Sequence, residues 1–257
     1  MKARLKFTKA GTMKFIGHLD IMRFFQKAFR RCEIDISYSQ GFNPHQLISF
    51  ASPLGVGLTS DGEYLDMQLE SSESSEKMID TINSAMNDEI RVTEFVQLPE
   101  RSKTAMSIIA AADYQISLKD GYGVCGDFQQ KFQQFMEQEE IVVVKKTKKN
   151  TTEMNIKPFI YQYAFTKENF ETETKHHYSD TVAEQYQNGQ ILFVRVAAGS
   201  AVNIKPNQIL EAFYQYIGQE IEPFSYQYHR LEMYADLAKE NEEHQFVTLT
   251  SLGTIID

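Results

Sequence analysis

Residues 3–38 read ARLKFTKAGTMKFIGHLDIMRFFQKAFRRCEIDISY, and three patterns follow one another in this stretch. From Ala3 to Lys9 apolar and polar side chains alternate, which predicts a half-buried strand. From His18 to Cys32 apolar side chains recur every three or four residues, which predicts an amphipathic helix. Residues 34–38 alternate again, as in a second strand. The side chains expected to face the core from the helix are Leu19, Met22, Phe25, Phe29 and Cys32.

The downstream elements extend this beginning to a complete unit over residues 1–98. They are an extended piece from Leu47 to Ala51, a strand with Leu65, Met67 and Leu69, a helix from Met78 to Met86 and a short strand from Arg91 to Gln97. The predicted order is therefore strand, helix, strand, strand, helix, strand. Residues 99–112 are interpreted as a linker.

The second half predicts the same order again. The expected elements are strands at 114–118, 141–144, 159–165, 191–196 and 222–233, and helices at 128–136 and 206–217. Residues 166–189 are polar and are interpreted as a long loop. The sequence thus predicts an α+β protein with two tandem ferredoxin-like (βαββαβ) units that have antiparallel sheets. Their limits are 1–98 and 113–235, and a C-terminal tail follows at 236–257.

Composition excludes several classes of protein. Apolar residues make up 42% and charged residues 24%, as in an ordinary globular protein. No apolar run approaches the ~20 residues of a membrane span, and we expect a cytoplasmic protein. The two cysteines, Cys32 and Cys125, are isolated from one another and form no metal-binding pattern. Phosphate-loop, dinucleotide-binding and nucleophile-elbow motifs are absent from the sequence, so no cofactor or metal is expected.

The charge of the chain is unevenly distributed. The formal net charge is −9, which argues against non-specific binding to nucleic acid. Residues 1–57, however, carry nine Lys and Arg against three Asp and Glu, a net of +6, which leaves −15 for the remainder. A positive end on an acidic body favours an anionic partner. The alternative is that the two ends simply differ in surface composition.

A basic face is predicted on the first helix. Arg23, Lys27 and Arg30 are spaced i, i+4 and i+7, and Arg31 extends the series. Arginine side chains present planar pairs of donors that suit phosphate or carboxylate. The alternative is a solvated helix face on which Asp20 pairs with Arg23.

Two histidines lie close to this basic face in the sequence. His18 begins the helix, and His45 follows Pro44 in a turn rich in hydrogen-bonding groups. The other polar residues assigned to this site are Tyr38, Ser39, Gln40 and Asn43. Imidazoles act as a general base or as hydrogen-bond partners near neutral pH, and we expect His18 and His45 to face one pocket. A capping or packing role for His18 is the alternative. Arg230 would join the basic face if the two units packed side by side.

The string GHLDIMRFFQKAFRR…ISYSQGFNPHQLISFASPLGVG, within residues 17–57, resembles a radical-SAM-linked family of bacterial proteins. In that family a similar domain occurs alone or fused to a cobalamin-binding-type radical SAM protein. The resemblance implies a radical SAM partner and a role related to RNA or the ribosome. Two cysteines cannot supply the three-cysteine motif of a radical SAM cluster, so the resemblance implies the accessory half.

Three functions remain open from the sequence. The first is an accessory, non-catalytic subunit that presents RNA or another phosphate-bearing substrate to a radical SAM partner. The second is a metal-independent RNA-processing endonuclease that uses His18 and His45 as acid and base. The third is a protein–protein adaptor whose basic surface binds an acidic patch of the radical SAM protein.

Overall fold

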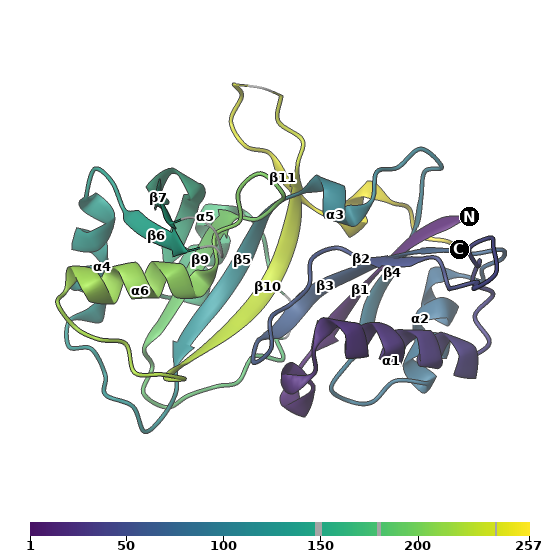
Figure 1. The fold of residues 1–257 in the computed structure, drawn as a ribbon, viewed down its shortest axis with the longest axis horizontal. Coiled ribbons are helices and arrows are strands. Elements are labelled where there is room, and N and C mark those ends of the chain that lie inside the picture. Colours follow the sequence, from purple (N-terminus) through teal and green to yellow (C-terminus); the bar gives the residue numbers. More distant parts are fainter. Residues whose placement is uncertain (147–150, 179–180, 240) are drawn as a thin grey trace. The chain divides into compact units, whose positions relative to one another are not determined.

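The computed structural model of the chain describes residues 1–146, 151–178, 181–239 and 241–257. Within these residues the fold is mixed α and β, with six α-helices and a large, mostly antiparallel sheet (Figure 1). The contacts within the chain divide it into two compact units. Unit 1 comprises Met1–Ala111, Thr181–Ala183 and Arg230–Asp257, and unit 2 comprises Ala112–Asp180 and Glu184–His229.

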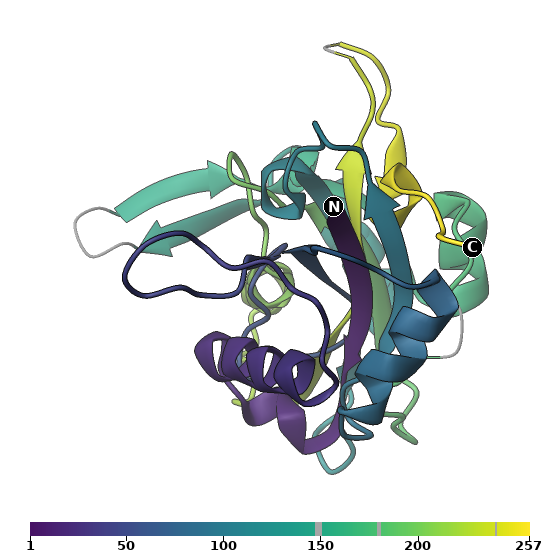
Figure 2. The same ribbon diagram turned by 90° about the vertical axis from the view of Figure 1, so that its right-hand side faces the viewer.

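The N-terminal part of unit 1 contains four strands and two α-helices, and its second strand lies at 48–50 instead of at the expected 34–38. They are β1 (Lys2–Lys9), α1 (His18–Arg31), β2 (Ile48–Phe50), β3 (Thr59–Gln68), α2 (Ser75–Ser84) and β4 (Val92–Leu98). β1 pairs antiparallel with β3 and β4, and β2 pairs antiparallel with β3, so the strand order is β4-β1-β3-β2. Leu5 of β1 is opposite both Leu65 and Phe95. One hydrophobic core joins β1 to both helices, which therefore cover the same face of the strands (Figure 2).

The C-terminal residues complete unit 1 and do not form the separate tail that we expected at 236–257. β10 (Tyr226–Asp236) lies next to β3 in the sheet and enters unit 1 at Arg230. It is followed by β11 (Phe246–Thr248) and the 3-10 helix η3 (Thr250–Leu252). Backbone hydrogen bonds in both directions join Thr254 to Gln97 of β4. The last residues thereby cover backbone groups at the edge of β4 that would otherwise be open to another chain.

Unit 2 differs from its sequence prediction at two places, and the segment that leads into it differs at a third. Its elements are β5 (Ile109–Leu118), α4 (Phe128–Glu137), β6 (Val142–Lys146), β7 (Thr151–Asn155), the 3-10 helix η2 (Lys157–Phe159), β8 (Ile160–Ala164), α5 (Lys167–Thr174), β9 (Ile191–Ala197) and α6 (Pro206–Tyr216). The strand expected at 141–144 pairs with β7 in a separate two-stranded sheet. The expected loop 166–189 contains α5, whose first turn is capped by the Thr166 hydroxyl. The expected linker 99–112 contains the short helix α3 (Ala105–Ile108) and the start of β5.

The orientation of α1 differs from the prediction at its first turn. Phe25 and Phe29 are buried as expected, but Leu19 is 64% exposed and Ile21 is buried instead. The ring of Phe25 packs 4.7 Å, centroid to centroid, from the ring of Phe7 on β1. This contact fixes the rotation of the helix about its axis, so that Ile21 faces the strands and Leu19 faces solvent.

The second face of β1 is buried as well, through ion pairs. Arg4 is only 1% exposed, because its guanidinium contacts Asp66 at 2.6 Å and donates to the carbonyl of Leu249. Lys6 contacts Glu232 at 2.7 Å. Burial raises the pKa of the Glu232 carboxyl, and the Lys6 ammonium opposes that shift. β1 is therefore enclosed on both faces.

Arg230 is also buried, which corrects its predicted place on the basic surface. Its Nη1 lies 3.0 Å from Oε1 of Glu63 and donates to the carbonyl of Ser52. Burial lowers the pKa of the nearby Lys9 amine. The Glu63 carboxylate opposes this shift and the Arg230 guanidinium adds to it. Arg230 is thus part of a charged cluster inside unit 1.

The orientation of α1 predicts a contrast between two of its apolar residues. Phe25→Ala should lower the free energy of unfolding by about 3–5 kcal/mol, because it leaves a cavity against β1. Leu19→Ala should change it by less than about 0.5 kcal/mol, because the side chain is exposed. Urea titrations followed by circular dichroism measure both values. Equal losses in the two variants would contradict the orientation.

The ion pair of Arg230 predicts a large loss of stability. Arg230→Ala should cost about 3–5 kcal/mol, because it leaves the Glu63 carboxylate buried without its guanidinium partner. Arg101→Ala is the matched control, since Arg101 is exposed, and its denaturation midpoint should equal that of the wild type. A midpoint for Arg230→Ala that also equals the wild-type value would show that Arg230 is solvated.

Candidate functional site

The predicted basic face is present on the solvent side of α1. Arg23, Lys27 and Arg30 are exposed on the side of the helix away from the buried Ile21, Phe25, Ala28 and Phe29. Arg31 is exposed too, but its guanidinium donates to the carbonyl of Ala85 at the end of α2. Asp20 does pair with Arg23, at 3.1 Å, but both side chains are more than 60% exposed. Such a solvated pair is weak and easily exchanged for another anion. The face therefore stays able to contact phosphate or carboxylate groups.

A loop of residues 37–46, here named the motif loop, projects between α1 and β2. Residues 34–38, predicted as a strand, form only the isolated bridges of Ile36 with Leu69 and of Tyr38 with Gln46. The loop is closed at its base by the amide of Ser39, which donates to the carbonyl of His45, and by a 2.8 Å hydrogen bond between Ser39 Oγ and His45 Nδ1.

The tip of the motif loop presents an aromatic ring to solvent. Gly41 has φ +116°, a conformation that side chains rarely adopt, and the next residue, Phe42, is fully exposed. Gln40 and Asn43 beside it are exposed too. Sequence reasoning assigned these polar neighbours to the site and passed over Phe42. The available signal was an apolar side chain at the centre of a Gly-Phe-Asn-Pro turn, where a turn needs none.

The motif loop and the basic face meet at Gln26 of α1. The carbonyl of Gln26 accepts hydrogen bonds from Arg30 Nε at 3.2 Å and from Gln46 Nε2 at 3.3 Å. Gln46 Nε2 also donates to the hydroxyl of Tyr38. One backbone carbonyl thus holds a basic side chain of the helix next to the base of the loop, and the two surfaces adjoin.

The structure does not bring His18 and His45 together. His18 packs edge to face on Phe50 and lines a cavity of about 20 Å³ with Lys9 and Glu63. His45 lines a different cavity, of about 250 Å³, together with Lys2. Lys2 and Lys9 are the two ends of β1, which at ~3.3 Å per residue lie about 23 Å apart. The expectation of one shared pocket is therefore wrong, since an acid and a base must both reach the same phosphate.

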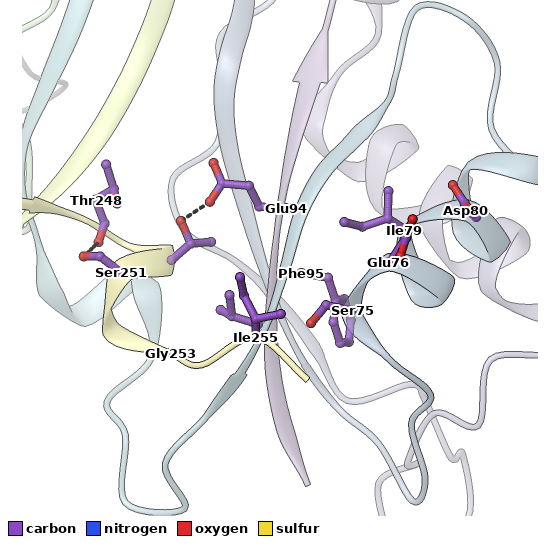
Figure 3. Close-up of a pocket in the computed structure, with 12 residues that line it drawn as sticks. Ser75, Glu76, Ile79, Asp80, Glu94, Phe95, Thr248, Ser251, Gly253 and Ile255 are labelled. Atoms are coloured by element: carbon purple, nitrogen blue, oxygen red, sulfur yellow. Dashed lines mark hydrogen bonds between the residues drawn. The ribbon is translucent and has the colours of Figure 1, made fainter. Parts of the chain in front are cut away.

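A larger groove, of about 540 Å³, lies among α2, β4 and the C-terminal residues of unit 1 (Figure 3). Its apolar floor includes Phe95 and Ile255. Three carboxylates line it, those of Glu76, Asp80 and Glu94, and Glu94 accepts a hydrogen bond from Thr250. Negative charge of this kind repels phosphate, so the groove does not extend the basic surface.

Metal-binding and membrane-spanning features are not found among the described residues. No group of three or more His, Cys, Asp or Glu side chains in this part of the chain could hold a metal ion. Cys32 and Cys125 are both free thiols. Outside the seven residues left undescribed, no helix combines the length and the apolar character needed to cross a membrane.

Comparison with known proteins places the chain in a family. The family described as "Uncharacterized protein conserved in bacteria (DUF2344)" matches residues 2–206, which include the whole of α1 and the motif loop. No curated protein matches the sequence. Because the match covers most of the 257 residues, the chain belongs to this bacterial family.

Proposed function

We propose that the protein is an accessory, non-catalytic binding subunit. It holds RNA, or another phosphate-bearing substrate, on the basic face of α1 and the motif loop, and a radical SAM partner performs the chemistry. The partner is inferred from the resemblance of residues 17–57 to the radical-SAM-linked family. The binding function rests on the arrangement of the described side chains in unit 1.

The observation that carries this proposal is the junction at Gln26. It joins exposed guanidinium groups to a loop whose tip is an exposed aromatic ring. Guanidinium groups bind the phosphates of a nucleic acid irrespective of its sequence. Exposed aromatic rings stack on bases that are not already stacked in a duplex. The combination therefore favours single-stranded RNA over an inorganic anion.

The fold supports the proposal at the level of architecture. We propose that residues 1–98 are a ferredoxin-like unit, because the strand order β4-β1-β3-β2 with both helices on one face has that topology. In unit 2, β5, α4, β8, β9, α6 and β10 follow the same order if the β6–β7 hairpin and α5 are insertions. Fold alone does not assign an activity, so the function still depends on the α1 surface.

The arrangement of the histidines argues against the endonuclease and leaves the adaptor as the remaining alternative. The endonuclease loses its acid–base pair, because His18 and His45 line different cavities. The adaptor would use the same basic face to bind an acidic protein surface, and RNA binding separates it from the proposed subunit. The exposed ring of Phe42 suits a protein surface as well as an RNA base, so the RNA-binding measurement is what separates the adaptor from the subunit.

The basic face predicts a change in RNA affinity and in its salt dependence. The double variant Arg23→Ala, Arg30→Ala should bind single-stranded RNA more weakly, and the slope of log K against log salt should fall by about 0.7 for each lost contact. The melting temperature should barely move, because both side chains are exposed. Fluorescence anisotropy with a labelled oligonucleotide at several salt concentrations measures both quantities.

A matched control is available on α2 and just before β4. Lys77→Ala, Arg91→Ala removes two exposed basic side chains that also pair with carboxylates three or four residues earlier in the chain, and its affinity should equal that of the wild type. An equal loss in both double variants would mean that only total charge matters. Unchanged affinity in the Arg23, Arg30 variant would refute the α1 surface.

The separation of the histidines predicts that the protein does not cleave RNA. Total cellular RNA incubated with the full chain in chelator should remain intact, whether the protein is wild type, His18→Ala or His45→Ala. Gel electrophoresis of the RNA measures the outcome. Discrete products that disappear in either variant would overturn the non-catalytic assignment in favour of the endonuclease.

A further inference from the structure

The cavity lined by His45 belongs entirely to unit 1 and is here named the loop cavity. Its volume is about 250 Å³, and it lies among the start of β1, the base of the motif loop, β2, the end of β3 and residues 98–104. Polar side chains that line it include His45, Gln46, Gln68, Ser102 and Lys103. Pockets for drug-sized ligands have about 300–1,000 Å³, so the loop cavity suits a single ring system.

Two side-chain oxygens on residues that line the cavity are buried and have no hydrogen-bond partner within the described residues. They are Oε1 of Gln46 and Oγ of Ser102. Gln46 is only 4% exposed. Its Nε2 already donates to the Gln26 carbonyl and the Tyr38 hydroxyl, and these contacts determine which amide atom is left as an acceptor. Leaving such an atom unpaired costs about 1–3 kcal/mol, so two of them in one cavity point to a ligand that supplies their partners.

The rest of the lining combines apolar walls with the side chains of two lysines, Lys2 and Lys103. Leu47, Ile48, Met67 and Leu98 contribute apolar surface. The one carboxylate, that of Asp66, is neutralised by Arg4 and also accepts a hydrogen bond from the amide of Ala105. Lys2 donates to the carbonyl of Ser102 at 3.3 Å. A ring with hydrogen-bonding edges matches apolar walls with one free acceptor and one free hydroxyl.

We propose that the loop cavity binds one nucleobase of the RNA held by the α1 surface. The inference rests on the proposed function and deepens it, because it adds base recognition to phosphate binding. Gln46 Oε1 accepts a hydrogen bond from an amino or imino group of the base, and Ser102 Oγ donates to or accepts from the same edge. Gln46 also joins the cavity to the basic face, since its amide bonds to Gln26 of α1.

Phosphate contacts and base contacts make separable predictions. Guanidinium groups on α1 bind all sequences alike, whereas hydrogen bonds to a base edge distinguish one base from another. The wild-type protein should therefore bind labelled ten-nucleotide oligomers of rA, rC and rU, and a mixed oligomer containing G, with unequal affinities at one salt concentration. The preferred oligomer should be bound about tenfold more tightly than the weakest, which corresponds to one good hydrogen bond.

The test compares variants of the full chain. Ser102→Ala removes the free hydroxyl with little change of shape and should reduce the preference about fivefold to tenfold without altering the salt dependence. Ser84→Ala is the matched control, because Ser84 is exposed on α2, does not line the cavity, and its hydroxyl donates to the carbonyl of Thr81, which does not line it either. Gln46→Leu should abolish the preference as well, and circular dichroism establishes whether that variant folds.

The outcomes separate the base site in the loop cavity from the phosphate surface on α1. Equal wild-type affinities for all oligomers, or a preference that survives Ser102→Ala, would overturn the base site while the phosphate surface stands. Failure of the wild-type protein to bind any oligomer would refute the proposed function itself. A direct second measurement uses free nucleosides at millimolar concentration, with nuclear magnetic resonance of the labelled full chain. Amide shifts confined to residues 45–49 and 98–104 would support the base site, and their absence with every nucleoside would overturn it.

Discussion

Phe7 on β1, Phe25 on α1 and Phe50 on β2 pack edge to face, with ring centroids 4.7 to 5.9 Å apart. Edge-to-face contacts are directional, since the positive edge of one ring meets the negative face of another. The three rings therefore fix both the distance of α1 from the strands and its rotation about its own axis. The exposure of the basic face is a consequence, because Arg23, Lys27 and Arg30 lie on the opposite side of the helix.

The same packing determines where the motif loop begins and ends. The loop leaves the C-terminal end of α1 and returns to β2, whose Phe50 belongs to the aromatic cluster. Its base is then tied to α1 through Gln46 and the Gln26 carbonyl. An exposed tip on a fixed base suits recognition, because little conformational entropy is lost at the base when a ligand binds. Phosphate binding and base recognition can thus occur on adjoining surfaces of one rigid element pair.

Polar groups inside unit 1 are of two kinds, and the difference separates structure from function. Arg4 and Arg230 are buried and Lys6 is half-buried, and each has an acidic partner, as buried charges must have in a stable fold. These pairs join β1 and β3 to the C-terminal residues and explain why the end of the chain belongs to the first unit. Ser37, Gln46 and Ser102, in contrast, each have a buried oxygen without a partner within the described residues, and the last two line the loop cavity. A fold seldom leaves such atoms unsatisfied unless something outside the chain completes them.

The sequence by itself determined most of the local elements of residues 1–98 and the composition of the α1 surface. The helix expected at 18–32 occurs at His18–Arg31, because apolar side chains recur in this segment with a period near 3.6 residues. The four exposed basic residues follow from the same period. Their solvent exposure needs no knowledge of distant residues beyond the direction of the core.

Tertiary structure alone decided which residues share a site. The burial of Arg230 depends on Glu63, 167 positions away in the sequence, and no local pattern reports such a pair.

Leu19 and Ile21 are equally apolar, and only the position of Phe7 decides which of them is buried. His18 and His45 lie 27 positions apart and line different cavities, because α1, which begins at His18, carries the chain from one side of unit 1 to the other. The unpaired oxygen of Gln46 likewise exists only because Gln26 and Tyr38 take the other end of its amide. Periodicity encodes the faces of an element, whereas the partners of those faces are set by contacts between residues far apart in the chain.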